Sequence, residues 1–328
     1  MDSDDSSPYF SGPGPTAVIA MGGHAFMQPG QPGTHEDHVL NARLITSQIM
    51  TLVNRGYRLV ITHGNGPQVG DLLLRDEASD ASLGRTPLDV LVAQTEGSLG
   101  YYLQQAMLNQ LRHAEVRRYV VTVVTQVIVD PDDPAFDAPI KPVGPYLTQA
   151  DAEKRADELG WAVAPHPDGR GWRRLVPSPK PLRVVQRNMI RRAAERGSIV
   201  IAAGGGGIPI CKDASDDYVG LEAVIDKDLT SAILATDVGA DLLIILTAVD
   251  QVYLRFGHPD QVALGAVTLA ECKRHIDAGH FPAGSMGPKV QAIYEFLQRG
   301  GSRALITSAE RLNDAMDGQA GTHFVGRI

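Results

Sequence analysis

The chain has 328 residues, of which 43% are hydrophobic and 21% are charged, and its net charge at pH 7 is −8. These proportions are ordinary for a globular protein, and this length allows one large α/β domain or two lobes. The acidic balance and the lack of a basic patch argue against nucleic acid as a partner. No run approaches the ~20 apolar residues that a membrane helix needs, so we expect no membrane partner either.

The first fifteen residues, MDSDDSSPYFSGPGP, are acidic and rich in Ser, Pro and Gly. They lack the basic start and apolar stretch of a signal peptide, and we expect 1–15 to form a disordered tail. The two cysteines, Cys211 and Cys272, form neither a metal-ligand spacing nor a disulfide framework. The sequence therefore predicts a cytoplasmic protein.

Apolar runs rich in β-branched residues predict strands from residue 16 onward. They are TAVIAM (16–21), RLVITH (58–63), YVVTVVTQVIV (119–129), SIVIAA (198–203), DLLIILT (241–247) and RALITS (303–308). Helical spacing fills several intervals, at 38–56, 228–240 and 287–301. This alternation favours a mainly parallel sheet covered on both faces, with ligands at the carboxyl ends of its strands.

The segment from about 130 to 181 interrupts this alternation. It is rich in proline and contains one short helical stretch, TQADAEKRADELG. That is too much irregular chain for a simple connection in a compact domain. We interpret it as an inserted excursion of the kind that forms a lid.

Three of the predicted strands run directly into glycine, at MGGHA, HGNGPQVG and AAGGGGIP. Glycine permits positive φ and close approach of a ligand to the backbone, and unpaired N–H groups at such turns bind anions. One cluster alone would be read as a tight turn, whereas three in one sheet favour phosphate or carboxylate binding. None follows GxGxxG or GxxxxGK[ST], which disfavours Rossmann and Walker sites.

Three lysines have unusual surroundings for a group that is normally a solvated surface charge. Lys141 stands between prolines in PIKPVGP, Lys227 between two aspartates in VIDKDL, and Lys289 after a glycine-rich turn in AGSMGPKV. Phosphoryl transfer requires positive charge around the moving group and little covalent help from the protein. These settings favour a functional role for Lys227 and Lys289 and leave Lys141 evenly balanced.

The longer motifs include ITHGNGPQVGDLLL, GWRRLVPSPKP, GLEAVIDKD and GHFPAGSMGPK. With them the chain resembles the carbamate kinases of the amino acid kinase superfamily, from about residue 16 to its end. The resemblance implies an α/β fold, an open αβα sandwich with a mainly parallel central sheet. It also implies a homodimer and a protruding lid subdomain at about 131–178. An acceptor-binding N-lobe would span about 16–222, and a nucleotide-binding C-lobe about 223–328.

The reaction implied by the resemblance is reversible phosphoryl transfer between carbamoyl phosphate and MgADP, giving carbamate and ATP. Lys141 would reach the transferring group from the subdomain, Lys227 and Lys289 would neutralise phosphate charge, and Asp228 would orient the lysines. Mg²⁺ would be carried largely by the phosphates, with no metal site made of protein ligands alone. Phosphate and acceptor would be bound by Gly22, Gly23, His24, Gly64, Asn65, Gly66, Glu96, Gly205 and Gly206. The nucleotide would be bound by Thr247, Val249, Asp250, Tyr253, Gly284, Ser285 and Met286.

Four residues, at three places in the chain, depart from the family pattern. His24 replaces the asparagine of GGNA, Glu96 replaces a glutamine, and Gln186 and Asn188 replace two acidic residues. His24 would donate the same hydrogen bond as asparagine, or it would mark a pocket for a different small acid. A His24–Glu96 pair would raise the imidazole pKa and place a cation beside the acceptor.

Two alternatives to a carbamate kinase follow. One is a kinase of another small acid or phosphate acceptor. The other is a nucleotide or metabolite sensor without catalysis, which the retained Lys141, Lys227, Asp228 and Lys289 argue against.

Overall fold

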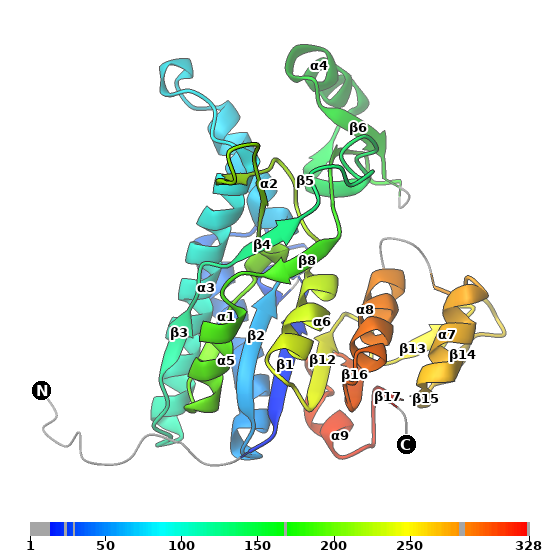
Figure 1. The fold of residues 1–328 in the computed structure, drawn as a ribbon. Coiled ribbons are helices and arrows are strands. Elements are labelled where there is room, and N and C mark those ends of the chain that lie inside the picture. The colour runs from blue at the N-terminus through cyan, green and yellow to red at the C-terminus, as the bar shows by residue number, and fades with distance from the viewer. Residues whose placement is uncertain (1–13, 23–24, 29, 167–168, 282–285, 327–328) are drawn as a thin grey trace, which may run out of the picture.

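The structure is a computed structural model, and it describes residues 14–22, 25–28, 30–166, 169–281 and 286–326 (Figure 1). Its centre is an eight-stranded sheet in the order β15-β17-β16-β12-β1-β2-β9-β3. All neighbours pair in parallel except β16 and β17. The strands are β1 (Thr16–Met21), β2 (Arg58–His63), β3 (Val120–Thr122), β9 (Ile199–Ile201), β12 (Leu242–Leu246), β15 (Ala266–Thr268), β16 (Arg303–Thr307) and β17 (Thr322–Val325).

Alternate residues of each central strand enter opposite cores, as the period of two in a strand requires. In β1, Val18 and Ala20 face one core and Ala17, Ile19 and Met21 face the other. The first core includes α5 (Arg187–Glu195), α6 (Lys227–Asp237) and α8 (Met286–Gln298). The second includes α1 (His35–Asn54), α3 (Leu88–His113) and α9 (Leu312–Met316). The predicted αβα sandwich with a mainly parallel sheet is confirmed.

The apolar run at 119–129 is two strands, where the sequence predicts one. β3 lies at the edge of the large sheet, and β4 (Gln126–Val129) belongs to a four-stranded sheet with order β11-β10-β4-β8. The partners of β4 there are β8 (Pro181–Val184) and β10 (Ile208–Lys212), and β11 is Tyr218–Gly220. The break falls at Thr125, whose hydroxyl donates to Val123 O at 2.7 Å in place of continued strand pairing.

Helix α1 begins three residues before the apolar spacing predicts. Thr34 caps it, because its side chain accepts from Asp37 N while Asp37 accepts in return from Thr34 N. This capping box satisfies backbone donors that the first turn of a helix leaves unpaired. The polar first turn therefore joins the helix without contributing to its apolar pattern.

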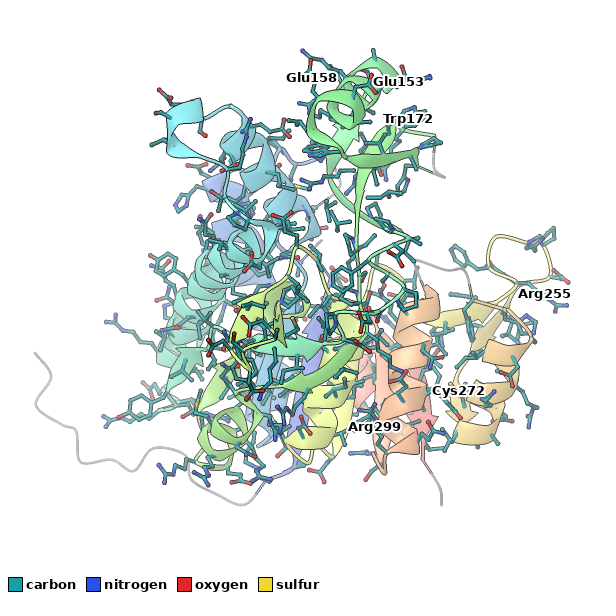
Figure 2. The ribbon with its side chains drawn as sticks, turned by 45° about the horizontal axis from the view of Figure 1, so that its top comes forward. Glu153, Glu158, Trp172, Arg255, Cys272 and Arg299 are labelled. Carbon is teal, nitrogen blue, oxygen red and sulfur yellow. The ribbon has the colours of Figure 1, made fainter. Side chains whose placement is uncertain are left out.

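The excursion after β4 forms a small layer that stands above the main body in Figure 1. It holds a three-stranded antiparallel sheet in the order β5-β7-β6, covered by α4 (Gln149–Leu159). The strands are β5 (Lys141–Leu147), β6 (Ala162–Pro165) and β7 (Trp172–Val176). Figure 2 shows Glu153, Glu158 and Trp172 together at its outer end, far from Arg255, Cys272 and Arg299 in the C-terminal part.

The small sheet is joined to the main body through α2 (Gly66–Glu77). Gly70 of α2 lies against Gly144 of β5 so closely that a Cβ on Gly70 would be 1.8 Å from the Gly144 Cα. Arg155 of α4 also donates to Glu77 at the end of α2, with Nε and Oε2 3.1 Å apart. A backbone contact and an ion pair thus hold the excursion, and with it Lys141, over α2.

The remaining elements lie towards the C-terminus: β13 (Val252–Leu254), β14 (Val262–Leu264) and α7 (Leu269–Asp277). Of the helices that the structure describes, none is both long and apolar enough to cross a membrane.

Candidate active site

The first residue of α6, Lys227, shares a buried carboxylate with a lysine of α8. Asp226 caps α6, because its Oδ1 accepts from Asp228 N at 2.9 Å and Leu229 N at 3.3 Å. The cap directs Asp228, which is 2% exposed, into the protein. Its Oδ1 accepts from Lys227 Nζ, and its Oδ2 accepts from Lys289 Nζ at 3.2 Å. The two predicted lysines therefore meet at one point.

Lys141 reaches the same place from β5. Its Nζ donates to Ile225 O at 3.1 Å and to Asp226 Oδ2 at 3.3 Å. Burial alone would raise the pKa of Asp226, but the neighbouring Lys141 and Lys227 outweigh it and lower this pKa to about 2. Burial lowers the pKa of Lys227, and Lys289 lowers it further, whereas Asp228 opposes both effects. The result is a compact group of three lysines held by two carboxylates, suited to binding phosphoryl oxygens.

The second glycine turn, in HGNGPQVG, and the third, in AAGGGGIP, lie side by side at the ends of the adjacent strands β2 and β9. Gly205 has a φ of +67° and faces Asn65, since a Cβ there would lie 2.2 Å from the Asn65 Nδ2. Gly206, with a φ of +96°, is packed in the same way on Ile225, whose carbonyl oxygen accepts from Lys141. The third turn therefore adjoins the lysine group through Ile225, and the second turn adjoins the third.

The first glycine turn is described only in part. Gly22 follows β1, and its carbonyl oxygen accepts from Ala25 N at 3.0 Å. Gly64 N donates to Met21 O at 2.9 Å, so the first two turns are neighbours. Gly23 and His24 lie outside the described residues, and so does the predicted His24–Glu96 pair.

Glu96 is 1% exposed in α3, and its Oε2 accepts from Thr125 N at 2.7 Å. Burial raises its pKa well above the usual value, although backbone hydrogen bonds from Thr125 and Gly204 lower it in part. The buried surroundings therefore favour the protonated, uncharged form of Glu96.

Replacing Glu96 by glutamine is expected to stabilise the protein increasingly as pH rises. A group whose pKa is higher in the folded than in the unfolded protein contributes most to stability below its unfolded-state pKa, which is 4.5 for Glu96. This contribution to stability is lost as pH rises. The free energy of unfolding of wild type should fall relative to Glu96→Gln by up to about 1.4 kcal/mol per pH unit. Urea denaturation of both proteins from pH 5 to 8 measures this. If a cation such as His24 paired with Glu96, the free energy of unfolding of wild type would instead rise with pH relative to Glu96→Gln. That result would contradict the prediction.

His63, the last residue of β2 and the first of HGNGPQVG, lies beside the site but is not among the residues predicted from the sequence. It is 1% exposed, and burial lowers its pKa to about 4. Its ring meets Phe26 edge-on at 5.4 Å between centroids. A histidine at a strand end immediately before a glycine turn is the signal that could have found it.

The residues expected to bind the nucleotide lie on three segments of the C-terminal part. Thr247 follows β12 and donates its N–H to Thr307 O at 3.0 Å, and Val249 and Asp250 come next in the same loop. Tyr253 lies in β13, with its ring 5.9 Å from that of Phe256. Met286 begins α8, the helix of Lys289, whereas Gly284 and Ser285 lie outside the described residues.

Comparison with known proteins agrees with this geometry. The model of the amino acid kinase family matches residues 15–308, and the chain belongs to that family. Within it the chain is a member of the carbamate kinase group. It is 48% identical over 311 residues to carbamate kinase of Thermococcus kodakarensis, covering 94% of this chain and 98% of the relative. Carbamate kinase of Pyrococcus horikoshii is 47% identical, covering 93% of this chain and 97% of its own.

A solved relative has the same fold. The structure of carbamate kinase from Giardia lamblia bound to AMP-PNP superposes with a TM-score of 0.88 at 39% identity. The match covers 96% of this chain and 99% of that one. The protein described here is therefore a kinase.

Proposed function

We propose that this protein is a carbamate kinase that transfers a phosphoryl group reversibly between carbamoyl phosphate and ADP, giving carbamate and ATP. One observation carries the proposal. Lys227 and Lys289 share Asp228, while Lys141 approaches from β5 and contacts the carbonyl of Ile225, on which the third glycine turn is packed. Relatives named carbamate kinase at 46–48% identity support it.

The residues would divide the work by charge. Phosphoryl transfer proceeds through a loose transition state whose charge spreads over the equatorial oxygens, so catalysis is mostly positioning and electrostatic stabilisation. Lys141, Lys227 and Lys289 would stabilise that charge, and Asp226 and Asp228 would keep the ammonium groups in place. The glycine turns would present main-chain N–H groups to the acceptor side. The 247–250 loop, Tyr253 and 284–286 would bind the nucleotide.

Mg²⁺ fits this site as a companion of the nucleotide. Asp226 and Asp228 are already engaged by lysines, and among the described residues no group of three His, Cys, Asp or Glu side chains could hold a metal. The phosphate oxygens would therefore hold the ion, which neutralises their charge when bound. The AMP-PNP complex of the Giardia relative supports nucleotide use.

The direct test is ATP formation from carbamoyl phosphate and MgADP, measured with a coupled assay. We expect turnover that depends on both substrates. Nucleotide binding without transfer to any acceptor would contradict the proposal and favour the sensor. ATP consumption with a different small carboxylate or phosphate, and none with carbamate, would favour the alternative acceptor, which rests on His24 and Glu96.

We further propose a homodimer formed through α3 and the edge strand β3. Tyr101 and Leu108 lie seven residues apart on α3 and are exposed, and so is Tyr119 just before β3. A spacing of seven places both side chains on one helix face, and an unpaired sheet edge beside apolar groups favours association. The cytoplasm is the proposed compartment, supported by the free buried thiols of Cys211 and Cys272.

A charge on this face should separate the subunits. We expect Tyr101→Glu with Leu108→Glu to change the mass in light scattering from two chains to one, because both carboxylates would be buried in the interface. Ile140→Glu, at another exposed apolar position, is the matched control and should leave the mass unchanged. A wild-type protein with the mass of one chain would refute the dimer.

A further inference from the structure

Gly204 begins the third glycine turn and lies between two buried ionisable side chains. A Cβ on Gly204 would be 2.6 Å from Cε1 and Nε2 of His63 and 3.0 Å from Cγ of Glu96. His63 comes from the end of β2, and Glu96 comes from the middle of α3. The turn is therefore packed directly on both side chains, and this close contact requires glycine at 204.

Glu96 also holds the residue before Gly204. Its Oε2 accepts from Thr125 N at 2.7 Å, and the Thr125 hydroxyl accepts from Ala203 N at 2.9 Å. Ala203 has a φ of +51°, a left-handed conformation that is unfavourable for a residue with a Cβ and must be held by its surroundings. Glu96 thus supports the turn at two successive residues.

The surroundings of both side chains favour their uncharged forms. Glu96 forms no ion pair within the described part of the chain, and its Oε1 is buried there without a hydrogen-bond partner. The ring of His63 has its Nδ1 3.1 Å from Gly64 O, and since a carbonyl only accepts, Nδ1 carries the proton of a neutral imidazole. The low pKa of His63 and the raised pKa of Glu96 agree with this assignment.

We propose that His63 and Glu96 are positioning residues of the acceptor site. Both side chains are uncharged and hold the third glycine turn in place on the side away from the acceptor. Glu96 does so as a carboxylic acid, in place of the glutamine amide of the family pattern. This inference rests on the proposed function. An anion bound at the turn would be repelled by a carboxylate packed on the other side of the turn. A unit charge at about 6 Å, in an effective dielectric constant of 20, changes an affinity by about 100-fold.

Kinetics of three variants test the positioning role. Glu96→Gln keeps the shape and the acceptor oxygen, and we expect its KM for carbamoyl phosphate at pH 7 to stay well below that of Glu96→Ala, as rescue by the conservative variant requires. Glu96→Ala and His63→Ala release the turn and should raise KM by about tenfold or more, with a smaller fall in kcat. Leu103→Ala, a buried change elsewhere in α3, is the control that should lower stability without changing KM. A tenfold higher KM in Glu96→Gln would overturn the proposal.

Infrared difference spectroscopy tests the protonation state without any turnover. The band of a protonated carboxyl should be present in wild type at pH 7 and absent from Glu96→Gln. An identical spectrum for the two proteins would refute the acid form. If wild type made no ATP from carbamoyl phosphate, the proposed function would fail, while this band would still decide the state of Glu96.

Discussion

Asp228→Asn is expected to reduce kcat by about 10²–10⁴-fold, which corresponds to about 2.7–5.4 kcal/mol of transition-state stabilisation. The side chain keeps its shape but loses the charge that holds Lys227 and Lys289 together. The two ammonium groups would then repel each other in a buried site, where breaking one partner of an ion pair is costly. Their positions around the transferring group would no longer be fixed.

The loss should grow with pH. Burial and Lys289 already lower the pKa of Lys227, and Asp228 is the largest influence that raises it. Without Asp228 this pKa falls further, so the variant loses the positive charge of Lys227 at a lower pH than wild type does. A pH profile of kcat for both proteins measures this difference. Asp157→Asn, an exposed change on α4, should match wild type throughout. A kcat within threefold of wild type in Asp228→Asn would contradict the assigned role.

Gly70→Ala is expected to displace β5 from α2 and to lower kcat/KM by about 100-fold, the loss that a shift of about 1 Å produces. The added Cβ would lie 1.8 Å from the Cα and 2.4 Å from the N of Gly144, and both contacts are with backbone that cannot rotate away. Gly144 has a φ of +75° and stands three residues after Lys141. The variant therefore moves Lys141 away from Asp226, and we also expect a loss of about 2–4 kcal/mol of stability.

The matched control is Gly97→Ala in α3, where a Cβ meets nothing within 4 Å. Alanine is a better helix former than glycine, so this variant should be neutral or up to about 1 kcal/mol more stable. Urea denaturation and steady-state kinetics on both variants make the comparison. Equal denaturation midpoints and equal kcat/KM for Gly70→Ala and wild type would show that α2 and β5 do not need this contact.

Much of the fold follows from local sequence. The run that forms β12 is apolar on both faces, and so are most of β1 and the middle of β2, a pattern typical of a strand buried between two helical layers. The split of 119–129 could not be predicted, because both halves are rich in the β-branched residues that are typical of strands. The hydroxyl of Thr125 and pairing with β8 and β10 separate them.

For the site, the sequence by itself determined which groups are present: the glycine turns at strand ends, the three lysines, and the aspartates beside Lys227. The neighbouring residues in the sequence are enough to identify these groups, because glycine and proline determine the backbone conformation of their own segment. Only the tertiary structure decided that Lys227 and Lys289 share one carboxylate, and that His63 and Glu96 meet behind Gly204. These contacts join residues distant in sequence, and desolvation, which sets their charge, depends on the whole packed surroundings.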